Sequence, residues 1–301
     1  MNTSKSIRIA TAPPSKEEIA NAFGRYKLAV KVLGQMVDAA EEMNRDDNRW
    51  FIFAEKIARK FLTQAYTLES LLSNDLYLIS KGQETRFVDF SGLVTLLRTQ
   101  FETHAVFYHL FGDKKCGMEE KIIRFRLWQL DGLKTRQGYA RPLGTKVDLA
   151  GELKEMEEIK RIINGFHFFQ KLDKSRQDFL MNKTAWRFTE SSLSNNDKSK
   201  WRLSIEQMIK NTGLKDSHFQ DWYSFASVHA HTCYWSVVQS DTLVEAEKII
   251  GEYVIIMQAS FVSSFFIKDF CGIYTFTKDI FDALPVLEQD VINSLNQGGR
   301  D

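Results

Sequence analysis

Proline and glycine are scarce in this chain, with 4 and 16 residues among 301. Both residues interrupt regular structure and build tight turns, so a fold of many short strands is not expected. Their scarcity favours long helices instead. The apolar fraction of 44%, with 13% aromatic residues, is large enough to form a sizeable core and argues against extensive disorder.

Cysteine is also rare. Cys116, Cys233 and Cys271 are odd in number and far apart, which predicts reduced thiols in a cytoplasmic protein rather than a disulfide framework. The N-terminal residues contain no apolar segment of the kind that signal peptides carry. A strongly apolar run without charged residues lies between Glu252 and Lys268, which is short for a membrane span. We therefore expect a buried core helix there and no membrane contact.

An excess of either charge is missing too, because 40 Lys and Arg face 39 Asp and Glu, for a net charge of +1. A protein that coats nucleic acid or an anionic membrane usually carries a clear basic excess. The balanced charge disfavours such a coating role, but it is compatible with RNA bound at one local site. The sequence has no P-loop, dinucleotide-binding glycine motif, nucleophile elbow or paired catalytic carboxylates, so we expect no cofactor.

The spacing of apolar residues predicts an all-α fold, a multi-helix bundle of long antiparallel amphipathic helices. We expect a flexible leader over 1–14, a single helical domain over 15–295 and a frayed tail over 296–301. Because their connection is short, the first two helices should form a hairpin within 15–81, ahead of a main bundle over 89–295.

The individual helices of this pattern are expected at 15–43, 49–80, 91–110, 118–134, 148–172, 200–211, 217–239, 242–271 and 278–295. Residues 81–89 should form a loop, and Pro285 should split or kink the last helix. Residues 182–200 are polar and lack periodicity, which predicts a long loop or mobile excursion.

Two of the expected helices carry polar residues where the pattern favours apolar ones. Arg98 and Glu102 are four residues apart and therefore share a helix face. Tyr223, Ser227 and His231 form a second stripe at the same spacing. A charged pair among apolar neighbours is either held by partners in the bundle or functional. We predict that the two stripes face each other.

These motifs resemble those of a bacterial all-helical family of unknown function, which carries an Arg-x-x-x-Glu helix and a later Tyr-x-x-x-Ser-x-x-x-His helix. Trp201 and the helix that ends near Gly213 fit between them, so the resemblance covers residues 50–270. The family is similar in turn to HEPN-type bundles, several of which are metal-independent RNA nucleases. The resemblance implies an HEPN-like core, a homodimer, and candidate catalytic roles for Arg98, Glu102, Tyr223, Ser227 and His231.

Two functions remain open on these residues. The first is a non-enzymatic interaction or ligand-binding protein whose buried Arg-Glu-Ser-His network fixes how two helices dock, which we favour because buried ion pairs often serve structure alone. The second is an HEPN-like RNA nuclease, a toxin or phage-defence component, with His231 as acid–base group and Arg98 stabilising phosphate charge. HEPN proteins carry an arginine a few residues before a histidine. This spacing does not decide between the two functions, since Arg98–His104 and Arg161–His167 fit it equally well.

One segment is a candidate RNA-facing surface. Basic residues outnumber acidic ones between positions 121 and 146, with aromatic residues interleaved, as is typical of RNA-binding surfaces. Its candidate binding residues are Lys121, Arg124, Arg126 and Trp128. A solvated face that balances the acidic stretch 152–158 is the simpler interpretation.

A metal site is not expected. His229 and Cys233 are four residues apart and would supply two ligands from one helix face. No second ligand pair follows in the sequence, whereas a structural zinc site takes four protein ligands. A packed histidine and a buried thiol are the simpler interpretation.

Overall fold

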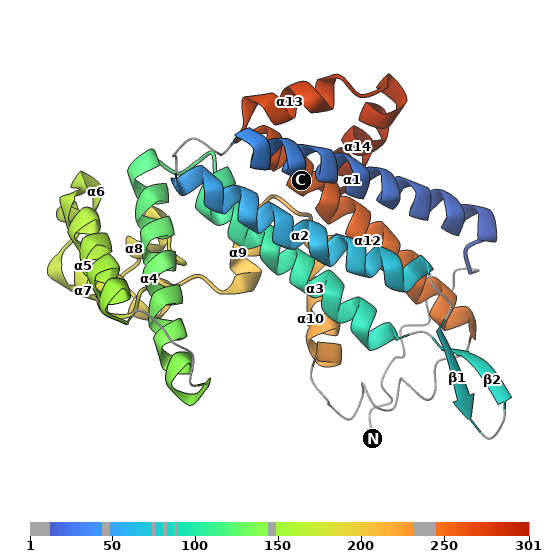
Figure 1. Cartoon of the computed structure of the whole chain (residues 1–301), viewed down its shortest axis with the longest axis horizontal. Coiled ribbons are helices and arrows are strands. Elements are labelled where there is room, and N and C mark those ends of the chain that lie inside the picture. Colours follow the sequence, from blue (N-terminus) through green and yellow to red (C-terminus); the bar gives the residue numbers. More distant parts are fainter. Residues whose placement is uncertain are drawn as a thin grey trace.

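A computed structural model of the chain describes residues 13–43, 49–73, 76–80, 83–87, 89–143, 149–230 and 245–300. Over these ranges the fold is all-α apart from one hairpin of two short strands, so the predicted multi-helix fold is confirmed. Four long helices lie side by side and form the body of the molecule (Figure 1): α1 (Lys16–Met43), α2 (Arg49–Ser73), α3 (Phe90–Phe107) and α12 (Glu245–Cys271).

The first two helices form the expected antiparallel hairpin (Figure 1). Ser15 and Glu18 make a reciprocal cap at the start of α1, since the Glu18 amide donates to the Ser15 hydroxyl and the Ser15 amide donates to the Glu18 carboxylate. Across the hairpin, the buried Tyr26 hydroxyl donates to the Ala65 carbonyl at 2.9 Å. This bond satisfies a polar group that burial would otherwise leave unpaired.

The second helix ends earlier than predicted. α2 stops at Ser73, and the antiparallel strands β1 (Leu76–Ser80) and β2 (Gln83–Phe87) follow, with Leu76 opposite Phe87. The predictions of helix to residue 80 and of a loop over 81–89 were therefore wrong. The sequence Leu-Tyr-Leu-Ile suits a strand as well as a helix, and a short apolar run cannot separate the two by periodicity.

α3 begins at a side-chain cap, where the Asp89 carboxylate accepts a hydrogen bond from the Gly92 amide at 2.9 Å. At its other end it continues into a single π-helical turn, η1 (Tyr108–Gly112). Such turns are rare and are often found near functional or polar sites. The turn places His109 in the interior of the protein, where it is 2% exposed.

A smaller group of helices packs beyond the end of α3 and lies at the left of Figure 1. It comprises α4 (Met118–Leu143), α5 (Leu149–Gly165), α6 (His167–Lys171), α7 (Lys174–Asn182), α8 (Glu190–Leu193) and η2 (Lys198–Lys200). The next helix, α9 (Ile205–Asn211), lies against α3. The segment 182–200 has little helix, as expected, but it is not an excursion from the fold. Its residues Trp186 and Phe188 are buried, which anchors the segment against α4.

The chain then returns to the body of the molecule through α10 (Asp216–Ala230) and α12, and ends in α13 (Thr275–Asp282) and α14 (Val286–Gly299). The split at Pro285 is confirmed, because α14 starts directly after it. The expected tail is folded up to residue 300: α14 reaches Gly299, and Arg300 pairs with Asp269 of α12 at 2.8 Å.

α12 lies in the core. Its Phe266 ring lies 4.5 Å from that of Phe61 on α2 and 4.4 Å from that of Phe107 on α3, measured between ring centres. Within the described ranges α12 is the one helix with the length and composition that would also suit a membrane span. More than half of its most apolar stretch is buried inside the protein, as in a core helix.

Candidate functional site

The contact between α3 and α10 brings three of the predicted site residues together. Arg98 Nε donates to Glu102 Oε1 at 2.9 Å along α3, and the Tyr223 hydroxyl of α10 donates to the same oxygen at 3.0 Å. The guanidinium carbon of Arg98 lies 5.1 Å from the centre of the Tyr223 ring. One carboxylate thus links the two helices, and the arginine covers the ring that delivers the second hydrogen bond.

This contact, which we call the Arg98 cluster (Arg98, Glu102 and Tyr223), is partly open to solvent. The side chains of Arg98 and Glu102 are 22% and 32% exposed. The sequence predicted a buried network, and the structure corrects this, because both side chains of the ion pair keep contact with solvent. Solvent screening therefore weakens the ion pair relative to a buried one.

The surroundings of the Arg98 cluster raise the pKa values of both Arg98 and Tyr223. Partial burial alone would lower the pKa of Arg98, but the neighbouring Glu102 carboxylate more than offsets this and raises it. Burial, followed by the charge of Glu102, raises the pKa of the Tyr223 hydroxyl above its usual value. Arg98 thus stays cationic and Tyr223 stays a neutral hydrogen-bond donor at neutral pH.

Ser227, the next residue of the predicted stripe, does not join the cluster. The Ser227 hydroxyl donates to the Tyr223 carbonyl at 2.8 Å, one turn back along its own helix. A serine bonded in this way satisfies its hydroxyl locally. His231 and Cys233 lie outside the described residues. The structure therefore gives no geometry for His231 in the predicted catalytic set, nor for Cys233 and His229 as a pair of metal ligands.

A second arginine lies beside the cluster and was not predicted from the sequence. Arg187 makes no ion pair among the described residues, and its Nε is buried without a hydrogen-bond partner. Partial burial and then the like charge of Arg202 lower its pKa, while the charge of Asp131 and, after it, the nearby Tyr223 hydroxyl act in the opposite direction. Nothing in the spacing of the polar segment 182–200 marks this arginine, since its position depends on how that segment folds back.

The four residues predicted to face RNA occupy different environments. Arg124 is 1% exposed and does not lie on a surface. Lys121 Nζ donates to the Phe111 carbonyl at 3.1 Å, and Trp128 packs edge-on against Phe53. Arg126 donates to Gln129 at 2.9 Å. A continuous basic face therefore does not form: Lys121, Arg124 and Trp128 share one side of α4, where Arg124 is buried, and Arg126 lies on another side.

Arg124 is instead the centre of a buried polar network that includes the π-helical turn. Its guanidinium donates to Glu120 at 2.5 Å, to Asp113 at 3.1 Å and to the His109 carbonyl at 3.0 Å. Glu120 also accepts from the backbone amide of Glu190 at 3.0 Å, so the network ties α4 to the first residue of α8. An arginine held by two carboxylates and a carbonyl is compensated in the low-dielectric interior.

A second buried network was also missed. His104 Nε2 lies 2.9 Å from Asp269 Oδ2 on α12, and the other oxygen of Asp269 accepts from Arg300 at 2.8 Å. His104 is the histidine that fits the HEPN spacing from Arg98, yet six residues turn it about 120° around the helix. It points into the core between α3 and α12 and is 2% exposed, so it shares no site with Arg98.

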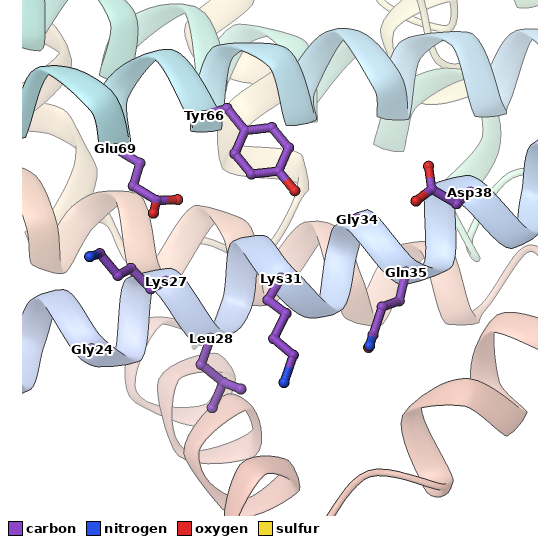
Figure 2. Close-up of a pocket in the computed structure, with 9 residues that line it drawn as sticks. All are labelled: Gly24, Lys27, Leu28, Lys31, Gly34, Gln35, Asp38, Tyr66 and Glu69. Atoms are coloured by element: carbon purple, nitrogen blue, oxygen red, sulfur yellow. The ribbon is translucent and has the colours of Figure 1, made fainter. Parts of the chain in front are cut away.

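Ligand-sized grooves occur elsewhere. Figure 2 shows one of about 580 Å³ between α1 and α2, where Tyr66 reaches across to the backbone of Gly34. A β-carbon at Gly34 would lie 3.1 Å from the Tyr66 hydroxyl, so glycine permits this approach. Its charged lining residues are Lys27, Lys31, Asp38 and Glu69, and none of the predicted site residues lines it. No group of three or more potential metal ligands occurs in the part of the chain that the structure describes.

Comparisons with family models, with curated proteins and with solved structures find no match to this chain. The described structure is all-helical, as the resemblance implied. Its relation to bacterial proteins and to HEPN-type bundles stays a prediction. The function therefore has to be argued from the side chains themselves.

Proposed function

We propose that this protein is a non-enzymatic interaction or ligand-binding protein in which the Arg98 cluster holds α10 against α3. The observation that carries this proposal is the shared acceptor: Glu102 Oε1 takes a hydrogen bond from Arg98 Nε and another from the Tyr223 hydroxyl. Groups that hydrogen-bond to one another across two helices fix how the helices pack, and none of them is left free to act as an acid or a base. The local bond of Ser227 agrees with this role.

The environments of other reactive groups support the same proposal. His104, His109 and His229 are buried, so none of them offers an accessible imidazole for proton transfer. Burial raises the pKa of the Cys116 thiol to about 12 and that of Cys271 to about 11. At neutral pH these two thiols are protonated, and the thiol is a poor nucleophile.

The substitution Arg98→Ala tests the proposal. It removes the donor that neutralises Glu102, and we expect the free energy of unfolding to fall by about 1 kcal/mol, the usual value of a partly exposed hydrogen-bonded pair. Urea titration measures this change. RNA incubated with the wild type in the presence of a chelator should stay intact, as it should with Arg98→Ala and His231→Ala.

Arg161→Ala is the matched control. Arg161 pairs with Glu158 within one helix, but both side chains are more than half exposed, at 75% and 51%. Its loss should change stability by less than about 0.5 kcal/mol. Cleavage of RNA by the wild type with chelator present, abolished by Arg98→Ala and His231→Ala at unchanged stability, would replace the proposal with a nuclease.

One observation favours that second candidate, an HEPN-like RNA nuclease in toxin or phage defence. Arg187 carries a charge with no ion-pair partner in the described ranges and lies near enough to Tyr223 for that hydroxyl to affect its pKa. Together with the partly exposed Arg98, it would offer two cations to a phosphate. Arg187→Ala separates the candidates: it should lower RNA cleavage in a nuclease and should leave the structural contact of Tyr223 with Glu102 intact.

A further inference from the structure

A pocket of about 360 Å³ lies among the helices α4, α5, α6 and α7, the group at the left of Figure 1. This volume is within the range of small-molecule sites. Three lysines, three side-chain amides, two apolar residues and one carboxylate line it: Lys134, Lys160, Lys174, Asn164, Gln177, Asn182, Phe169, Met181 and Asp178. None of these residues belongs to the Arg98 cluster, so the pocket can be tested independently of the proposed function.

The lysines differ in how their charges are balanced. Lys160 pairs with Glu157 at 2.5 Å, and Lys174 pairs with Asp178 at 2.9 Å, each along its own helix. Lys134 of α4 makes neither a hydrogen bond nor an ion pair with any residue in the described ranges. The pocket thus contains one ammonium group without an anion.

The surroundings of Lys134 disfavour the charged form of its ammonium group. Partial burial lowers its pKa, and the nearby positive charge of Lys160 lowers it further. Asp131 acts in the opposite direction, but its carboxylate already accepts hydrogen bonds from Thr184 Oγ1 at 2.8 Å and from Trp186 Nε1 at 3.3 Å. A partly desolvated cation beside another cation is stabilised by an anion that lies between them.

We propose that this pocket binds the phosphate group of a small phosphate monoester, held by Lys134 and Lys160. A phosphate offers several acceptor oxygens, and its charge-assisted hydrogen bonds to lysine are stronger than neutral ones. The amides of Asn164 and Asn182 also line the pocket and supply further donors. Phe169 and Met181 give the carbon part of the ligand an apolar wall.

The charges around the pocket favour a small ligand over RNA. The outer face of α5 carries Glu157 and Glu158, whose side chains are 72% and 51% exposed. An extended polyanion that entered the pocket would place further phosphates against these carboxylates, which repel them. A single phosphate on a compact molecule avoids that repulsion.

Isothermal titration calorimetry with phenyl phosphate tests the pocket. Phenyl phosphate should bind the wild type saturably, and phenol should not. Lys134→Met keeps the apolar stem of the side chain and removes its charge, and it should weaken binding at least tenfold. Lys160→Met should do the same, and it carries the test if the first variant does not fold.

Lys154→Met is the control, because Lys154 lies exposed on α5 and does not line the pocket. It should bind phenyl phosphate as the wild type does, and so should Arg98→Ala. Three results would overturn the proposal: no saturable binding at millimolar phenyl phosphate, equal binding of phenol, or equal weakening by Lys154→Met. Displacement of phenyl phosphate by a short RNA without a terminal phosphate would also overturn it in favour of a nucleic-acid surface.

Discussion

His109 shows how surroundings set the charge of one side chain. Its Nε2 donates to the Trp186 carbonyl at 3.1 Å, while Nδ1 faces the guanidinium of Arg124 at 3.4 Å. Burial, and then the positive charge of Arg124, lower its pKa to about 3. The imidazole is therefore neutral in the folded protein throughout the range in which an unfolded histidine takes up a proton.

This difference makes stability depend on pH. Below pH 6.5 the unfolded chain binds a proton at position 109 that the folded protein does not bind, so stability falls as the pH falls toward 3. Between pH 7 and pH 5 this loss amounts to about 2 kcal/mol. His109→Gln keeps a donor for the Trp186 carbonyl and removes the titrating group. Between pH 7 and pH 5 its free energy of unfolding should therefore fall by about 2 kcal/mol less than that of the wild type.

Urea unfolding of both proteins at the two pH values measures the difference. His167→Gln, at an exposed position on α6, should retain the pH dependence of the wild type. An identical pH dependence in His109→Gln and the wild type would mean that the folded protein protonates His109.

Two glycines within long helices have opposite surroundings. A β-carbon at Gly24 of α1 would meet nothing within 4 Å, whereas one at Gly251 of α12 would lie 2.5 Å from the Phe90 ring of α3. Alanine is the better helix former by about 1 kcal/mol. The close approach of α12 to α3, however, leaves no room for a methyl group at Gly251.

We therefore expect substitution by alanine to act in opposite directions. Gly24→Ala should raise the free energy of unfolding by about 0.5–1 kcal/mol. Gly251→Ala should lower it by about 1–3 kcal/mol, because the Phe90 ring or the helix must shift. Denaturant titration of the two variants measures both effects, and a stabilised Gly251→Ala would show that α12 and α3 pack less closely than described.

The long helices are joined into one body by aromatic residues at their common centre. Phe266 of α12 is fully buried and contacts Phe61 of α2 and Phe107 of α3. Its ring also lies 5.9 Å from that of His104, next to the buried pair with Asp269. A cavity at this position would remove contacts with both α2 and α3 at once.

Phe266→Ala should accordingly destabilise the whole protein by about 3–5 kcal/mol, and Phe266→Leu by about 1 kcal/mol. Guanidinium unfolding followed by far-ultraviolet circular dichroism measures both. Val286→Ala is the control, since Val286 is 71% exposed and should have almost no effect. A small effect of Phe266→Ala would mean that the helices pack around a different centre.

The sequence alone determined the helical class and several helix ends. Apolar spacing reports which face of a segment is buried, and the cap at Asp89 and the break at Pro285 act through bonds within a few residues. The spacing of Arg98 and Glu102 also sufficed to place them in contact, because four residues make about one helical turn. These features are local, so they can be read along the chain.

The partners of the charged residues were decided by the tertiary structure. Arg98 and Arg124 each have a glutamate four residues away, yet the first pair is partly exposed and the second is buried. The difference arises from groups far along the chain, such as Tyr223 on one pair and the Glu190 amide on the other. Local spacing shows which side chains share a helix face, but burial and charge balance depend on which distant segment covers that face.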